Sequence, residues 1–156
     1  MDMLCENGGG GIVKALNVKI YGNGSETLLL SHGFGEDQSA WHFLVPLLAY
    51  YFKVVVFDMI FSPNVNPKLY NPNRYCSNFN GYADDLICLL DQLHVKNTIY
   101  LGHSMSAMIG CMAAIKRPQL FTHLILLSGS PRCSPFLFPE VPSMHKSLQN
   151  DSLIIV

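Results

Sequence analysis

A serine flanked by small residues, in the run Gly102-His103-Ser104-Met105-Ser106, is the stretch of this sequence best suited to chemistry. It follows an apolar run and precedes a helix-like segment, and its small outer residues let strand and helix approach closely. A sharp strand-to-helix turn of this kind lifts a serine hydroxyl to the top of a parallel sheet, with the next backbone N–H facing an oxyanion. On its own, the pattern fits Ser104 as a nucleophile and an ordinary turn with a solvated serine equally well.

A second chemical feature is the glycine-flanked loop His32-Gly33-Phe34-Gly35, which follows the apolar run Thr27–Ser31. If this run and the run before Ser104 are strands of one parallel sheet, the loop lies beside the serine turn and supplies a second oxyanion donor. The expected donors are the backbone N–H groups of Phe34 and Met105. The alternative is a plain turn with a structural histidine, but two motifs in this order favour a hydrolase-type site.

Strands and helices alternate along the chain around these motifs. A short alternating strand is expected near residues 18–20, and apolar runs predict buried strands over residues 27–31, 53–58, 98–101 and 123–128. Helical patterns predict helices over residues 41–51, 84–93 and 105–117. Prolines and asparagines in residues 59–81 predict a long irregular connection. The alternation predicts an α/β fold, with a mainly parallel sheet and helices on both faces.

Three acidic residues upstream of the serine have structural explanations. Asp58 ends a predicted strand. In hydrolases whose serine lies on such a strand-to-helix turn, the catalytic acid follows the serine in the chain. We therefore expect Asp58 to anchor the loop after its strand. Asp84 and Asp85 fall in the first turn of a predicted helix, where the helix dipole favours negative charge. None of the three is expected to act as the catalytic acid.

Several longer stretches carry a resemblance to one known family: residues 17–22, 31–41, 84–86, 102–110, 116–121 and 130–132. They resemble the plant strigolactone and karrikin receptors, α/β-hydrolase-fold proteins that hydrolyse or covalently hold butenolide ligands and signal through partner proteins. The resemblance runs from about Leu16 to Arg132 and implies that Gly33, Phe34 and His103 contact the ligand. The chain is most similar to the receptor-like paralogues, because residues 57–62 replace the glycine-rich loop of the better known receptors.

The sequence after Ser104 lacks a convincing acid and histidine. A serine hydroxyl is a poor nucleophile without a base in hydrogen-bond reach. His123 starts a predicted strand, so it lies at the end of the sheet away from the serine turn. Glu140 and His145 lie in a tail broken by prolines. We therefore expect an incomplete α/β-hydrolase fold that lacks the lid and the last strands.

Two functions of different classes stay open on the sequence alone. The chain is either a serine hydrolase or butenolide receptor, as its parent family implies, or a non-catalytic fragment that acts only by binding. Its 156 residues fall short of the roughly 200 or more of a complete α/β-hydrolase. The expected division is a flexible leader over residues 1–15, the amino-terminal half of a hydrolase domain over residues 16–132, and an unrelated, disordered tail over residues 133–156.

Composition and charge argue against several other functions. The formal net charge is −1 with scattered charges, which gives no basic stripe for nucleic acid and no polybasic patch for membranes. The first residues lack a signal-peptide pattern, and no apolar run approaches the roughly 18 residues of a membrane span. Five cysteines without C-x-x-C spacing indicate neither a zinc site nor a disulfide framework. We expect a soluble cytoplasmic or nuclear protein with no metal and no cofactor.

Overall fold

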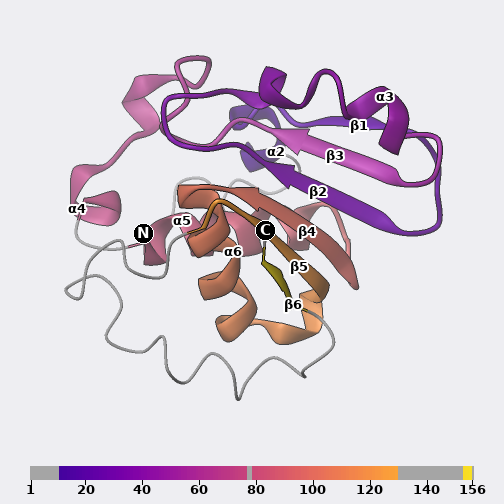
Figure 1. Cartoon of the computed structure of the whole chain (residues 1–156). Coiled ribbons are helices and arrows are strands. Elements are labelled where there is room, and N and C mark those ends of the chain that lie inside the picture. Colours follow the sequence, from indigo (N-terminus) through magenta and orange to yellow (C-terminus); the bar gives the residue numbers. More distant parts are fainter. Residues whose placement is uncertain (1–10, 77–78, 130–152, 156) are drawn as a thin grey trace.

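A six-stranded sheet forms the centre of the computed structural model, which describes residues 11–76, 79–129 and 153–155 (Figure 1). The strands are β1 (Lys19–Tyr21), β2 (Thr27–Ser31), β3 (Lys53–Phe57), β4 (Thr98–His103), β5 (Phe121–Leu127) and β6 (Leu153–Ile155). They lie in the order β1-β3-β2-β4-β5-β6, and β1 pairs antiparallel with β3 whereas the other pairs are parallel. The predicted α/β fold with a mainly parallel sheet is confirmed.

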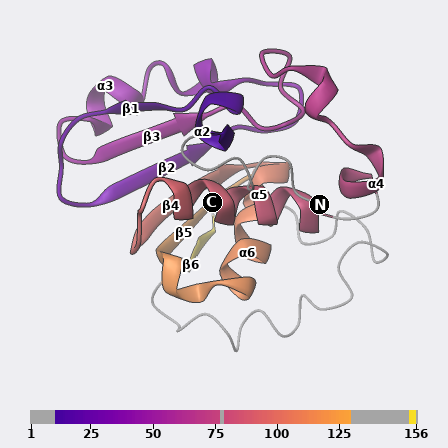
Figure 2. The same ribbon diagram turned by 180° about the vertical axis from the view of Figure 1, so that it is seen from behind.

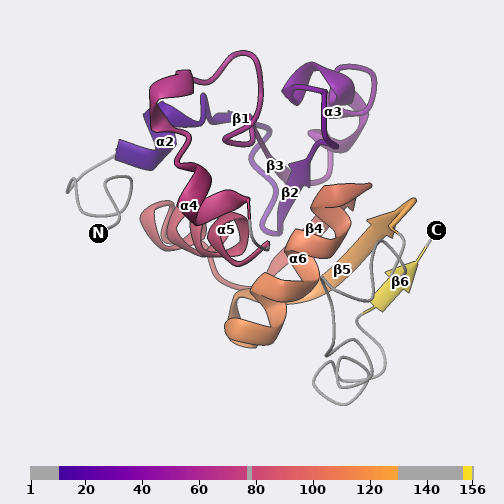
Figure 3. The same cartoon turned by 90° about the vertical axis from the view of Figure 1, so that its left-hand side faces the viewer.

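Helices cover the two faces of this sheet unequally (Figures 2 and 3). On one face lie α2 (Gly11–Ala15), α4 (Pro72–Tyr75), α5 (Asn80–Gln92) and α6 (Met105–Lys116). The other face carries the short α3 (Val45–Leu48). The described residues also form 3₁₀ turns at Gln38–Trp41, Pro67–Leu69 and Pro118–Leu120.

Two apolar clusters fill the space between sheet and helices, because successive side chains of a strand point to opposite faces. The larger cluster packs residues such as Leu29 and Val55 against α2, α5 and α6. The smaller cluster packs residues such as Leu30 and Val54 against Trp41 and the α3 region. The sheet core is therefore built from leucine and valine runs that the sequence identifies as buried strands.

Helix α6 approaches β4 closely, because two glycines leave room for it. A Cβ on Gly102 would lie 2.7 Å from the Ser106 carbonyl oxygen, and a Cβ on Gly110 would lie 2.1 Å from the Tyr100 ring. Tyr100 is fully buried, and its hydroxyl donates to the Ser106 carbonyl oxygen at 2.8 Å. This packing fixes the first turn of α6 against the strand that precedes it.

Several local predictions need correction. The leader was expected to be flexible to residue 15, but Gly11–Ala15 is a helix whose Ile12 is fully buried in the core. The helix predicted over residues 41–51 is reduced to α3, preceded by the 3₁₀ turn that ends at Trp41. The connection over residues 59–81 is largely irregular as predicted, although it contains a 3₁₀ turn and α4.

The end of the chain differs from the predicted disordered tail at β6. Leu153–Ile155 pairs parallel with β5, with Leu124 opposite Leu153 and Ile125 opposite Ile154. A parallel strand at this position covers an edge of β5 that would otherwise present unpaired backbone groups. Residues 130–152 and residue 156 lie outside the described residues.

The acidic residues of α5 are not dipole partners, because the helix begins at Asn80 and both lie beyond its first turn. Asp84 lies 2.6 Å from Lys116 Nζ. Asp85 is buried, where it accepts hydrogen bonds from Arg74 Nη2 at 2.6 Å and the Tyr75 hydroxyl at 2.7 Å. Burial raises the pKa of Asp85 despite these two partners.

The cysteines of the described residues are in two states. Cys76 and Cys111 are free thiols, and burial raises the pKa of Cys111 to about 12. Cys88, in contrast, is disulfide-bonded. The sequence analysis did not predict this bond, because the cysteine spacing alone carries no signal for it.

Candidate active site

Ser104 occupies a sharp turn between β4 and α6. Its backbone has φ 54° and ψ −117°, a region that residues with a Cβ rarely adopt. The Ser104 N–H donates to the Leu127 carbonyl oxygen of β5 at 2.8 Å, which holds this conformation in place. Ser104 is exposed, so the turn presents the residue to solvent at the end of the strand.

The loop after β2 is a tight turn that leaves a backbone donor unused. The Glu36 N–H donates to the Gly33 carbonyl oxygen at 3.3 Å, and Gly35 has φ +80°, as the third residue of a type II turn requires. Phe34 is the second residue of this turn, and none of the hydrogen bonds of the described residues uses its N–H. Met105 is the first residue of α6, where the N–H has no partner inside the helix.

Strand register brings these two loops to the same end of the sheet. β2 and β4 are parallel neighbours in which Ser31 lies opposite Gly102. Phe34 and Met105 each follow by three positions, on the carboxyl side of their strands. The Ser106 hydroxyl donates to the His32 carbonyl oxygen, although the two residues are 74 positions apart. This bond ties the first turn of α6 to the start of the loop after β2.

One carboxylate also connects the two loops. Glu36 Oε2 accepts a hydrogen bond from the Gly33 N–H at 2.8 Å and lies 3.2 Å from His103 Nδ1. Partial burial raises the pKa of Glu36, but the hydrogen bond from Gly33 and the contact with His103 outweigh it and lower the pKa below its ordinary value. A Cβ on Gly33 would lie 2.9 Å from His103 Nδ1 and 3.1 Å from Glu36 Oε2, so the three groups meet in one place.

His32 has a structural role at the start of the loop. The ring is fully buried, and its Nε2 accepts a hydrogen bond from the Met59 N–H at 2.9 Å. This bond assigns the ring proton to Nδ1, which donates to the Gly33 carbonyl oxygen at 2.9 Å. The histidine therefore links the loop after β2 to the loop after β3.

Asp58 anchors its loop, as the sequence analysis predicted. Its buried carboxylate accepts hydrogen bonds from the Gln38 N–H at 2.9 Å, Gln38 Nε2 at 3.0 Å and Asn17 Nδ2 at 3.0 Å. Three donors satisfy most of the acceptor positions of a carboxylate. This arrangement holds together three segments beneath the candidate site.

The loop after β3 places Phe61 beside the candidate site. The Phe61 ring centroid lies 5.4 Å from that of Phe34 and 5.7 Å from that of His32. Phe34 is 73% exposed. An apolar aromatic surface therefore adjoins the loop that carries the predicted donor.

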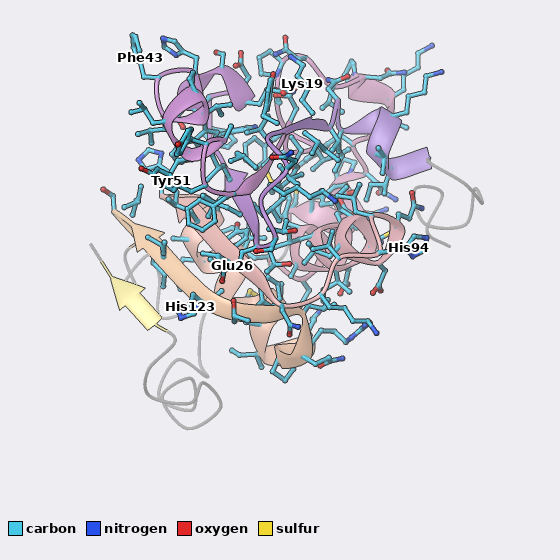
Figure 4. The ribbon with its side chains drawn as sticks, turned by 90° about the vertical axis from the view of Figure 1, so that its right-hand side faces the viewer. Lys19, Glu26, Phe43, Tyr51, His94 and His123 are labelled. Carbon is cyan, nitrogen blue, oxygen red and sulfur yellow. The ribbon has the colours of Figure 1, made fainter. Side chains whose placement is uncertain are left out.

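No base for Ser104 is found in the part of the chain that the structure describes. Downstream of Ser104 this part holds one histidine, His123, and no aspartate or glutamate. His123 is exposed and lies opposite Ile99 near the start of β4, the end away from the serine turn (Figure 4). Glu140 and His145 lie outside the described residues.

Metal clusters and membrane-spanning helices are both missing from the described residues. These residues contain no group of three or more His, Cys, Asp or Glu side chains that could hold a metal ion. None of their helices is long and apolar enough to cross a membrane. Among the described residues, the serine turn and the loop after β2 are the features that form the candidate site.

Residues 26–150 match the sequence profile of the alpha/beta hydrolase fold. The chain belongs to this family. It is 47% identical over 121 residues to "Strigolactone esterase D14" of Arabidopsis thaliana and 51% identical over 123 residues to "Karrikin insensitive 2 receptor CA" of Petunia hybrida. The resemblance of this chain to the strigolactone and karrikin receptors is therefore confirmed.

Each of these two alignments covers 78% of the chain but only 45% of the relative, so the chain spans less than half of the proteins it matches. A solved hydrolase from Oleispira antarctica is 36% identical, with a TM-score of 0.73, and the match covers 77% of this chain and 44% of that one. A hydrolase from Pseudomonas aeruginosa is 25% identical, with a TM-score of 0.67 over 76% of this chain and 43% of that one. The fold is therefore a partial α/β-hydrolase fold.

Proposed function

We propose that this chain carries the nucleophile half of a receptor-type hydrolase, in which Ser104 attacks the carbonyl carbon of an ester or lactone. The observation that supports this role most is the backbone of Ser104, which is held at positive φ and exposed at the carboxyl end of a central parallel strand. A strained strand-to-helix turn is the arrangement that presents a nucleophilic serine in this fold.

The charge that develops on the carbonyl oxygen would be stabilised by the backbone N–H groups of Phe34 and Met105. Strand register places both at the same end of the sheet, and neither N–H has a partner among the described hydrogen bonds. Fixed donors of this kind stabilise an oxyanion better in the transition state than in the ground state. In this proposal Gly33, Phe34 and His103 line the ligand site.

The ligand class comes from the relatives. One is named a strigolactone esterase and another a karrikin receptor. A butenolide-type ligand, whose lactone or ester carbonyl Ser104 would attack, is consistent with both names. The same likeness is our basis for proposing signalling proteins as partners and the cytoplasm or nucleus as the location.

A second candidate function is a fragment that binds without catalysis. It is favoured by the lack of any base for Ser104 among the described residues, since the attack requires a group that takes the hydroxyl proton. Under the first function, that base and its acid belong to the portion of the relatives that this chain does not span.

A hybrid enzyme separates the two functions. Residues 11–132, which include the core helix α2, would be joined to the carboxyl-terminal half of the petunia receptor. Hydrolysis of an aryl acetate would be compared with that of the hybrid carrying Ser104→Ala. We expect turnover that the substitution abolishes. A folded hybrid with no turnover would favour the binding fragment, and turnover that survives Ser104→Ala would show that Ser104 is not the nucleophile.

A further inference from the structure

We propose that Glu36 is a positioning residue that fastens the oxyanion loop to the nucleophile turn through Gly33 and His103. The proposal rests on the proposed function for its catalytic meaning, but the contact itself belongs to this chain. It assigns a role to a side chain that neither of the two sequence motifs includes.

The geometry of the contact carries the proposal. A single oxygen, Glu36 Oε2, is 2.8 Å from the Gly33 nitrogen and 3.2 Å from His103 Nδ1. Gly33 precedes the proposed donor Phe34, and His103 precedes Ser104. The carboxylate therefore joins the residues immediately before the donor and before the nucleophile, which come from loops that are 67 positions apart in the sequence.

Glycine at position 33 is part of the same arrangement. A Cβ there would lie within 3.1 Å of both Glu36 Oε2 and His103 Nδ1. A side chain at this position would push the carboxylate and the imidazole apart. The absence of a Cβ is thus what allows the carboxylate to reach the backbone N–H and the imidazole together.

The charges around Glu36 make the contact dependent on its ionisation. His103 faces it from the nucleophile turn and favours the carboxylate form. The buried His32 ring follows β2, and its two nitrogens are used by the Met59 N–H and the Gly33 carbonyl oxygen. Asp37, the next residue, turns its carboxylate to the Ser39 N–H at 2.7 Å. Asp58, from the loop after β3, is held by Gln38 and Asn17. A protonated Glu36 would hold both partners less strongly, because a charged acceptor forms the stronger hydrogen bond.

A second hydrogen bond joins the two loops, and it does not depend on the ionisation of Glu36. The Ser106 hydroxyl donates to the His32 carbonyl oxygen, and this bond joins two neutral groups. Acidification should therefore loosen the Gly33 end of the loop and leave its start in place. This difference between neighbouring residues is measurable.

The test is a pH titration of the backbone amide signals of Gly33 and Phe34 by NMR, on the full 156-residue chain. In the unchanged protein both signals should move together, with a midpoint below the ordinary glutamate value of 4.5. Glu36→Gln should abolish this transition, because the amide keeps the size of the side chain but does not ionise. The matched control Glu26→Gln, at an exposed glutamate before β2, should leave it unchanged.

His103→Gln tests the other half of the contact. It should move the midpoint upward toward the ordinary value, because it removes an interaction that lowers the pKa of Glu36. This variant decides the question if Glu36→Gln does not fold. A Gly33 signal without an acidic transition would overturn the proposal, as would a Phe34 signal that stays fixed while Gly33 moves, or an unchanged midpoint in His103→Gln. These readings need no turnover, so they are independent of the hybrid-enzyme result.

Discussion

At the scale of single residues, the site depends on backbone conformation at least as much as on side chains. Ser104 is held at positive φ by its bond to Leu127, and Gly35 at positive φ completes the turn that leaves the Phe34 N–H unused. Residues in such regions cost free energy, on the order of 1–3 kcal/mol each for a residue with a Cβ. The surrounding hydrogen bonds offset this cost and fix the geometry of both turns.

The first prediction concerns the shape of the oxyanion loop. In the hybrid enzyme, Gly33→Val should lower kcat by about 10²–10³-fold, the usual effect of losing one oxyanion donor, because the new Cβ would displace Glu36 and His103. Met105→Leu should be mild, since Met105 is proposed to act through its backbone. Steady-state kinetics on the two folded variants provide the check, and equal, negligible effects would mean that the loop is only a turn.

Sequence reasoning identified the candidate residues that belong to local motifs. It missed the side chains that form hydrogen bonds between segments distant in sequence. The serine turn and the glycine-flanked loop are visible because their spacing is local. Ser106 was recognised only for its small size, and its bond to His32 was not foreseen. Glu36 was not singled out at all, because its contact with His103 depends on the register of two strands distant in sequence.

At the scale of elements, the close packing of α6 on β4 keeps the serine turn in place. The second prediction is that Gly110→Ala destabilises the chain by about 1–3 kcal/mol, because its Cβ would lie 2.1 Å from the buried Tyr100 ring. Ile115→Ala, at an exposed position of the same helix, is the control and should change the free energy of unfolding much less. Chemical denaturation gives both values, and similar values for the two variants would contradict the packing argument.

The third prediction concerns the pairing of β6 with β5. Ile154→Pro places a proline in the middle of the three-residue β6, where proline disfavours a strand, and should leave the edge of β5 open to other chains. We expect a larger aggregated fraction by size-exclusion chromatography than for Ile154→Thr, which keeps the N–H and suits a strand. Equal elution profiles would show that β6 does not protect this edge.

The elements themselves were predictable to different degrees. Apolar runs identified the central strands, because a strand buried on both faces needs continuous hydrophobic residues. The prediction of a helix over residues 41–51 was wrong in its length. It treated the apolar residues of this segment as a buried helix face, but several of them remain exposed, including Phe43, Leu47 and Tyr50. β6 was not expected, since ordering the end of a proline-rich tail costs about 1–2 kcal/mol per residue in backbone entropy.

At the scale of the whole molecule, the described helices cover one face of the sheet much less than the other (Figure 3). Ile99, Ile125 and Leu127 are only partly buried there, whereas Leu124 and Leu126 of β5 are buried against the α6 side. The chain also spans only 45% of the length of its relatives.

The fourth prediction is that the 156-residue chain is nearly inactive toward simple esters. Loss of the base of a catalytic triad lowers kcat by roughly 10⁶-fold, which leaves only the contributions of the oxyanion donors and of binding. An aryl-ester assay on the chain and on Ser104→Ala should give the same low rate. Robust hydrolysis that disappears in Ser104→Ala would point to a base in the residues after Gly129.

The most direct test of the account is the rate at which a fluorophosphonate modifies Ser104, measured by intact mass and peptide mapping. Such a reagent reports an activated serine in a formed oxyanion site, and it needs no natural ligand. The account predicts rapid modification at Ser104 in the hybrid enzyme, slow modification in the 156-residue chain, and none at this position in the Ser104→Ala hybrid. Equal rates in hybrid and chain, or modification of the hybrid at another serine, would contradict it.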